Sequence, residues 1–254
     1  MKRLLFINSP YFHKMKAMIF AAGLGTRLQN ETVAKPKALV DVGGKPLLQH
    51  ALEKLKAEGI AEIVVNVHHF SELVISFLKE NDFGVTIHIS DETENLLDTG
   101  GGLKKAAGFF TESEPVLVYN VDILSNLNIS QLIAEHRKSG ALVTLVVRKR
   151  ETQRYFKFDA EKRLVGWINK KTGETKVSYP VHFDNATEMA YSGIHIFNPK
   201  MFSLMPETNR FSVTDFYLEL AKTHKILGFY DDSDLWMDVG KPEHLKEARK
   251  IFRS

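Results

Sequence analysis

The feature that most constrains this chain is a repeated alternation of short apolar runs with longer segments that have helical spacing. Apolar runs bounded by turn residues are typical of strands buried in a parallel sheet, whereas apolar residues three and four apart indicate a helix packed by one face. The pattern predicts strands over residues 17–22, 62–67, 85–90, 116–119, 142–147, 189–197 and 226–230. It predicts helices over residues 47–58, 71–79, 103–110, 129–139, 214–222 and 242–252.

Strands that alternate with helices in this way require crossover connections onto a mainly parallel sheet with helices on both faces. The runs over residues 155–158 and 164–168 depart from the pattern, because only a polar turn separates them, as in an antiparallel hairpin. We therefore expect an α/β fold, with a three-layer, Rossmann-like, mixed and mainly parallel sheet and a small antiparallel insertion lobe.

The length of the chain bears on its domain organisation. A chain of 254 residues can form one large domain or two small ones, and no linker rich in glycine or serine divides it. We expect a single domain with a cleft over residues 15–254, in which residues 15–150 form a first half and residues 151–254 a second half. Residues 1–14 are expected to be an N-terminal extension, because a second methionine, Met15, stands just before the first convincing strand.

Charge and cysteine usage exclude several classes of function. Lysine plus arginine number 34 and aspartate plus glutamate 31, and a net charge of +3 gives no electrostatic signature for binding nucleic acid or an anionic membrane. The chain has no cysteine, which excludes disulfides, thiolate zinc sites and cysteine nucleophiles. Its apolar runs fall far short of the ~20 residues that a membrane-spanning helix needs. We expect a cytoplasmic protein.

The first predicted strand leads into a glycine-rich loop, AAGLGTRL at residues 21–28. Ligands of such sheets bind beyond the carboxyl ends of the strands, and glycines let backbone N–H groups approach phosphate oxygens. A dinucleotide site would need glycine where Leu28 stands and an acidic residue near 66–68, and a P-loop would need Gly-Lys-Ser/Thr. A plain strand-to-helix turn remains the alternative.

Two cations follow the glycines. Arg27 belongs to the loop itself, and Lys37 lies in the segment AKPKAL at residues 34–39, where Pro36 disfavours a long helix. An extended return of the chain would bring Lys37 beside Arg27. Arginine offers phosphate a bidentate fork and lysine a compact charge, although either residue alone is most often a solvated surface cation.

Residues 21–39 resemble the signature of the sugar-1-phosphate nucleotidyltransferases, GxGTRL followed by PK-x-L. Four further segments match that family in order over residues 15–254: LDTGGGL at 97–103, NVD at 120–122, YSGI at 191–194 and WMDVG at 236–240. Within the family the chain is similar to the small N-acetylmuramate-1-phosphate uridylyltransferases and the mannose-1-phosphate guanylyltransferase-like group.

The resemblance implies an enzyme that transfers a nucleotidyl group from a nucleoside triphosphate to a sugar 1-phosphate, giving a nucleotide-sugar and pyrophosphate. It favours UTP or GTP, a Mg²⁺ cofactor and direct in-line attack, with residues 15–150 holding the nucleotide and 151–254 the sugar. Oligomer formation is compatible with it. The alternative is a non-catalytic regulatory module of the same fold that binds a nucleotide or a nucleotide-sugar.

Residue by residue, the resemblance implies four sets of ligands. The catalytic cations are Arg27 and Lys37. The nucleotide contacts are Ala22, Gly23, Gly25, Thr26, Thr99, Gly100 and Gly101. The sugar contacts are Asn169, Glu188, Ser192 and Gly193. The metal ligands are Asp122 and Asp238.

Several of these residues also have a plainer interpretation. Asp122 at a strand end is often a turn or helix cap, Thr99 can cap a helix, and the three glycines that follow can form a turn before one. Two positions depart from the family: Val121 stands where glycine is usual, and Asn169 where many relatives have a glutamate that binds sugar hydroxyls. Lys170 beside Asn169 can reach a sugar phosphate or be a solvated charge.

Overall fold

The structure is a computed structural model that describes residues 15–95, 97–111 and 114–252, so the predicted N-terminal extension lies outside the described residues. The strands are β1 (Lys16–Phe20), β2 (Asp41–Val42), β3 (Lys45–Pro46), β4 (Glu62–Val67), β5 (Thr86–Asp91), β6 (Val116–Asn120), β7 (Ile123–Ser125), β8 (Val143–Arg148), β9 (Arg154–Phe158), β10 (Leu164–Asn169), β11 (Thr175–Val177), β12 (Thr187–Phe197), β13 (Ile226–Tyr230) and β14 (Trp236–Asp238). The α-helices are α1 (Leu47–Ala57), α2 (Ser71–Glu80), α3 (Asp98–Lys105), α4 (Ile129–Ser139), α5 (Pro180–Phe183), α6 (Val213–Leu220) and α7 (Pro242–Ile251). Short 3-10 helices are η2 (Thr26–Thr32), η3 (Lys37–Leu39), η4 (Ala106–Phe109) and η5 (Pro199–Leu204). Among the described residues, no helix combines the length and apolar character needed to cross a membrane.

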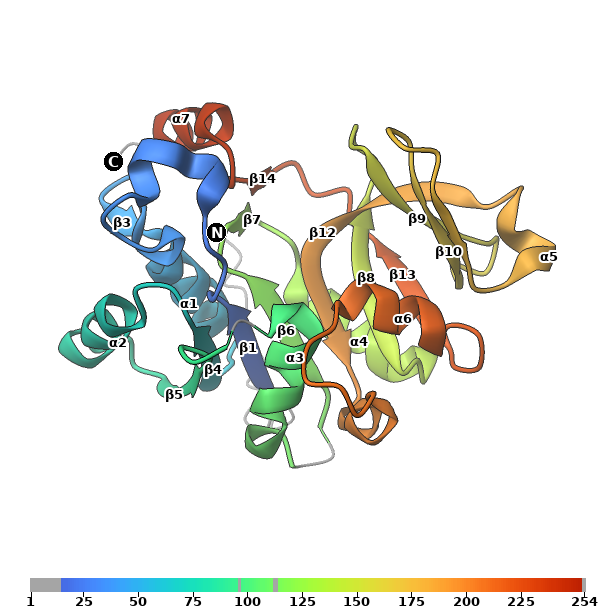
Figure 1. Ribbon diagram of the computed structural model, residues 1–254, viewed down its shortest axis with the longest axis horizontal. Helices are drawn as coiled ribbons and strands as arrows, with labels where there is room; N and C mark the ends of the chain where they lie inside the picture. The colour runs from blue at the N-terminus through green and yellow to red at the C-terminus, as the bar shows by residue number, and fades with distance from the viewer. Residues whose placement is uncertain (1–14, 96, 112–113, 253–254) are drawn as a thin grey trace, which may run out of the picture.

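The central sheet has ten strands, and its main path runs β11-β10-β9-β12-β6-β1-β4-β5, with β8 beside β12 and β13 beside β8. Pairing is parallel from β6 through β1 and β4 to β5, and between β8 and β13. It is antiparallel where β12 meets β6, β8 and β9, and through β9, β10 and β11. The mixed α/β fold and its antiparallel lobe are confirmed (Figure 1).

Alternation of side chains along the strands explains the three layers. Ala17 and Ile19 of β1 belong to a core that also contains the apolar faces of α1, α2, α4 and α7. Met18, between them, belongs to a second core with Leu103 of α3 and the apolar residues of α6. Successive residues of a strand point to opposite faces. The sheet is therefore buried on both sides, which is why its central strands are apolar throughout.

The end of the chain returns to the first half of the fold. Figure 1 shows α7 beside the early segment that contains η2 and η3. The Arg249 guanidinium of α7 donates to both carboxylate oxygens of Glu31, at 2.6 and 3.0 Å, and to the Asp41 carbonyl. The ring of Phe252 packs edge-on against His50 at 5.4 Å. These contacts fix β14, just before α7, against the first half.

Two predicted boundaries are wrong for identifiable reasons. The first strand ends at Phe20 rather than at residue 22, because the next two residues bond to a side chain of the neighbouring strand. The helix predicted over 103–110 begins at Asp98 and ends at Lys105. Its three glycines therefore lie inside the helix. A Cβ on Gly101 would stand 2.0 Å from the carbonyl oxygen of Asn209, so a larger residue would not fit there. The glycines allow close packing rather than a turn.

Two buried histidines make the stability of the fold depend on pH. His136 of α4 shares a 2.8 Å hydrogen bond with the Thr144 hydroxyl, and burial lowers its pKa from 6.5 to about 4. His195 of β12 shares a 2.6 Å hydrogen bond with the Tyr191 hydroxyl, and burial lowers its pKa to about 3. Below pH 6.5 the unfolded chain takes up a proton at each position and the folded protein does not. The stability from these neutral rings is therefore complete above pH 6.5 and is lost as the pH falls toward 4.

We expect the free energy of unfolding to fall between pH 6.5 and 5 by up to ~1.4 kcal/mol per pH unit for each of these histidines. The substitution His136→Asn should remove about one such contribution from the slope, because one group no longer takes up a proton on unfolding. Urea unfolding at several pH values measures the slope, with the exposed His224→Asn as the control. A slope that is the same in His136→Asn and in the unsubstituted protein would contradict this account.

Candidate active site

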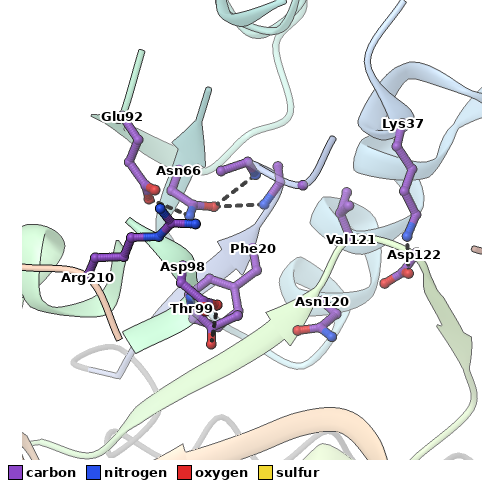
Figure 2. Close-up of a pocket in the computed structure, with 13 residues that line it drawn as sticks. Phe20, Lys37, Asn66, Glu92, Asp98, Thr99, Asn120, Val121, Asp122 and Arg210 are labelled. Carbon is purple, nitrogen blue, oxygen red and sulfur yellow. Dashed lines mark hydrogen bonds and ion pairs between the residues drawn. The ribbon is translucent and has the colours of Figure 1, made fainter. Parts of the chain in front are cut away.

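The glycine loop after β1 is fastened by a side chain of the neighbouring strand. The backbone N–H groups of Ala21 and Ala22 donate to the Oδ1 atom of Asn66, near the end of β4, at 2.7 and 3.3 Å. The amide NH₂ of Asn66 donates in turn to Glu92 Oε1 at 2.7 Å. Figure 2 shows Asn66 between Glu92 and the loop. One asparagine thus fixes the path of the loop where the sheet ends.

Glu92 is buried, with 1% of its surface exposed. Burial raises its pKa, against the hydrogen bonds from Asn66 and from the Leu97 N–H. A Cβ on Gly102 would stand 2.5 Å from Glu92 Oε1, so the third glycine of α3 makes room for this carboxyl group. The sequence pattern predicts no role for Asn66, although a polar side chain near the end of an apolar strand is itself a signal of a functional position.

A first cavity opens at the carboxyl ends of β1, β4 and β6. Of the residues predicted to contact a nucleotide, Ala22, Gly23 and Thr99 line it. The other lining residues include Asn66, Asp98, Asn120, Val121 and Arg210.

The remaining predicted nucleotide contacts do not line this cavity. Gly25 has a φ of +67° and precedes Thr26, the first residue of η2. Gly100 and Gly101 pack against the segment 209–211, and the Gly100 N–H donates to the Phe211 carbonyl at 2.9 Å. Thr99 also has a structural partner, since its hydroxyl accepts the Val213 N–H at 3.0 Å. That Gly25, Thr26, Gly100 and Gly101 contact a nucleotide stays a prediction.

The pairing of β7 with β14 brings distant parts of the chain together. Asp238 is the register partner of Ile123, and the Val239 N–H donates to the Asp122 carbonyl at 2.9 Å. The two aspartates predicted to bind a metal therefore lie side by side, although they are far apart in the sequence.

The predicted cations lie at the same point. Lys37 Nζ forms an ion pair with the Asp122 carboxylate, as Figure 2 shows. Gly240 marks the centre of the group: a Cβ there would stand 2.8 Å from an Arg27 guanidinium nitrogen, 2.8 Å from Asp238 Oδ1 and 3.2 Å from Asp122 Oδ2. We call Arg27, Lys37, Asp122 and Asp238 the charged centre.

The charged centre perturbs its own carboxyl groups. Burial raises the pKa of Asp122, against the attraction of Lys37, and the neighbouring Asp238 raises it further. Burial also acts to raise the pKa of Asp238, but the Gly240 N–H and the charges of Lys37 and Arg27 together lower it. Two carboxylates this close repel one another, so a bound cation would relieve the repulsion.

These carboxylates fit Mg²⁺, a hard cation that prefers oxygen ligands and commonly binds through one or two carboxylates, water and substrate phosphates. Among the described residues there is no group of three or more histidine, cysteine, aspartate or glutamate side chains placed to hold a metal. Asp122 and Asp238 would therefore share the cation with oxygens from a ligand, which is how Mg²⁺ binds with nucleotides.

A second cavity lies on the other side of the charged centre, toward the antiparallel lobe. It is lined by Arg27, Asp122 and Asp238, and by three of the predicted sugar contacts, Asn169, Ser192 and Gly193. Asp122 and Asn120 line both cavities, which therefore meet at the charged centre.

The predicted sugar contacts differ in which groups they can present to a ligand in the second cavity. Glu188 does not line the second cavity, and its carboxylate is held by Lys170 at 2.7 Å. The Ser192 side chain is fully buried, whereas its carbonyl accepts the Trp236 indole N–H at 3.0 Å. Gly193 has a φ of +78°, and a Cβ there would stand 2.8 Å from Ile123. Arg150, Arg154 and Lys176 also line the cavity and were not predicted.

Val121, the departure from the family glycine, needs no unusual backbone. It is not among the described non-glycine residues with positive φ, its side chain is 4% exposed, and it packs in the core below the first cavity. Its N–H donates to the Phe20 carbonyl at 3.2 Å. The backbone freedom of glycine is therefore not required between Asn120 and Asp122.

The fold and the charged centre define a class of mixed α/β domains with a glycine loop after the first strand and two cavities that meet at paired carboxylates. The chain belongs to the nucleotidyl transferase family, because the sequence model of that family matches residues 16–254. The resemblance inferred from the sequence motifs is confirmed.

Relatives in this family cover most of the chain. It is 34% identical to the mannose-1-phosphate guanyltransferase of Yarrowia lipolytica over 247 residues, which are 94% of this chain but 64% of that protein. It is 35% identical to the N-acetylmuramate alpha-1-phosphate uridylyltransferase of Caulobacter vibrioides over 238 residues, 89% of this chain and 92% of that protein. The chain thus spans less than two thirds of the Yarrowia relative.

The fold is shared with HddC from Yersinia pseudotuberculosis. The two structures superpose with a TM-score of 0.77 at 23% sequence identity, over 94% of this chain and 99% of HddC. HddC has also been solved in complex with GMP-PN.

Replacing Asn66 tests how the loop is held. Asn66→Ala should lower the free energy of unfolding by about 1–3 kcal/mol, because two buried backbone N–H groups lose their acceptor. It should also speed hydrogen exchange at the amides of Ala21 and Ala22. The control Asn81→Ala, which removes an exposed asparagine bonded to the Phe77 carbonyl, should leave those two amides unchanged. Equal exchange in Asn66→Ala and the unsubstituted protein would show that the loop is held in another way.

Proposed function

We propose that the protein transfers a nucleotidyl group from a nucleoside triphosphate to a sugar 1-phosphate, releasing pyrophosphate. One observation carries this proposal: Arg27, Lys37, Asp122 and Asp238 surround the point where the two cavities meet. A triphosphate in the first cavity and a sugar 1-phosphate in the second would place the reacting phosphorus at this point.

The charged centre supplies what such a reaction needs. In-line displacement at phosphorus depends on positioning and on neutralising the charge of the phosphoryl oxygens. Arg27 and Lys37 place two positive groups where that charge develops, and Asp122 and Asp238 would hold Mg²⁺, which polarises the α-phosphate when bound. The phosphate of a sugar 1-phosphate is already an anionic nucleophile, so no protein side chain has to remove a proton from it.

The comparisons support UTP or GTP as the nucleotide. The relative from Caulobacter vibrioides is a uridylyltransferase, the one from Yarrowia lipolytica is a guanyltransferase, and HddC was solved with GMP-PN. We propose that the protein works in the cytoplasm and supplies a nucleotide-sugar for the cell envelope.

The alternative, a regulatory module that binds a nucleotide or nucleotide-sugar without reaction, had Val121 as its main support. That residue occupies ordinary backbone and is buried, so it does not by itself disable the site. The four charged side chains also favour the enzyme, because binding alone does not need that set.

Pyrophosphate release tests the proposal, measured with Mg²⁺ across four nucleoside triphosphates and a panel of sugar 1-phosphates. Lys37→Ala and Asp122→Asn should each lower kcat by about 100-fold or more, because each removes a group that stabilises charge in the transition state. Lys35→Ala, a neighbouring lysine outside both cavities, is the matched control. Melting curves of the variants check that they fold.

A near-normal rate in either variant would refute the assigned roles. Nucleotide binding without pyrophosphate release in every combination would favour the regulatory module.

A further inference from the structure

One face of the antiparallel lobe forms a wall of the second cavity. Arg154 of β9 is the register partner of Asn169 of β10, and Trp167 of β10 is the partner of Lys176 of β11. Residues two apart on a strand share a face, and direct partners on neighbouring strands lie side by side on it. All four residues line the second cavity, which identifies the face that a bound sugar would meet.

The cations on this wall differ in how their charge is balanced. Lys176 is held by the carboxylates of Asp215, at 2.6 Å, and Glu174, at 3.7 Å. Arg154 is exposed on the cavity wall and has no ion pair with any residue that the structure describes. Its guanidinium is therefore the cation of the lobe face that remains available to a ligand.

Asn169 adds a second donor next to Arg154. Its Oδ1 atom accepts the Lys171 N–H at 3.0 Å, which fixes the orientation of the amide. The NH₂ group makes no hydrogen bond within the described part of the chain and belongs to a residue of the cavity wall. A glutamate at this position would face Arg154 across the strand pair and neutralise it. The asparagine leaves that charge uncompensated.

A guanidinium beside an amide NH₂ is a set of donors without an acceptor, and its complement is a carboxylate. The 1-phosphate of a sugar would be held elsewhere, at the charged centre. A carboxylate at Arg154 would therefore be a second anionic group of the same ligand. The indole of Trp167, on the same wall, offers a flat surface for the sugar ring.

We propose that Arg154 and Asn169 form a subsite for a carboxylate carried by the sugar of the sugar 1-phosphate. This proposal rests on the proposed function and narrows its substrate class to acidic sugar 1-phosphates.

Two substrates that differ by one acid-bearing group test this subsite. N-acetylmuramate 1-phosphate is N-acetylglucosamine 1-phosphate with a lactyl ether added, and the lactyl group carries the acid. We expect kcat/KM to be at least about tenfold higher for the acidic sugar, which is the lower end of what a charged hydrogen bond contributes. Pyrophosphate release with the preferred triphosphate measures both values.

Substitutions in the cavity wall test whether Arg154 and Asn169 cause that preference. Arg154→Gln should reduce the ratio of the two kcat/KM values by about tenfold or more, because it removes the charge. Asn169→Glu should reduce it similarly, because the new carboxylate would pair with Arg154. Lys171→Gln is the matched control, since Lys171 is a neighbouring exposed cation outside the cavity, and it should leave the ratio unchanged.

The outcomes separate this proposal from the proposed function. Equal use of both sugars, or an unchanged ratio in Arg154→Gln, would overturn the subsite while leaving the nucleotidyl transfer intact. A preference for glucose 1,6-bisphosphate over glucose 1-phosphate, without one for the lactyl sugar, would overturn it in favour of a phosphate site. Absence of pyrophosphate with every sugar would overturn both proposals.

Discussion

The site depends on one short pairing, in which β7 meets β14 as a two-stranded antiparallel piece apart from the main sheet. Asp122 lies just before β7 and Asp238 ends β14, so this pairing alone sets their separation. It places two like charges together in a largely buried position, which costs free energy unless cations compensate them. Arg27 of η2 and Lys37 of η3 provide that compensation.

The rest of the fold holds this arrangement in place. Asn66 fixes the start of the loop that leads into η2, where Arg27 lies. The Arg249–Glu31 ion pair fixes α7, which follows β14, to the same helix η2. On the other side, the indole N–H of Trp236 in β14 donates to the Ser192 carbonyl of β12. Three elements distant in sequence are thus tied to one point between two cavities.

Much of this could be predicted from the sequence, because the signals are local. Apolar runs in strands buried on both faces indicate the sheet, and the glycine loop with Arg27 and Lys37 resembles a family signature. What could not be predicted depends on register. Asn66 meets Glu92 only because β4 and β5 pair in one register, and Arg154 meets Asn169 only through the pairing of β9 with β10. The helical position of the α3 glycines could not be predicted for a similar reason, since the segment 209–211, which packs on them, comes much later in the sequence.

The central claim is that Asp122 and Asp238 hold one divalent cation together with a triphosphate. Electron paramagnetic resonance of Mn²⁺ tests it directly, because the free ion gives a signal that weakens on binding. With UTP or GTP present, the account predicts one tightly bound Mn²⁺ per chain. It predicts at least about tenfold weaker binding in Asp238→Asn, since one of the two carboxylates that hold the metal is lost. Equal Mn²⁺ affinity in Asp238→Asn and the unsubstituted protein would contradict it.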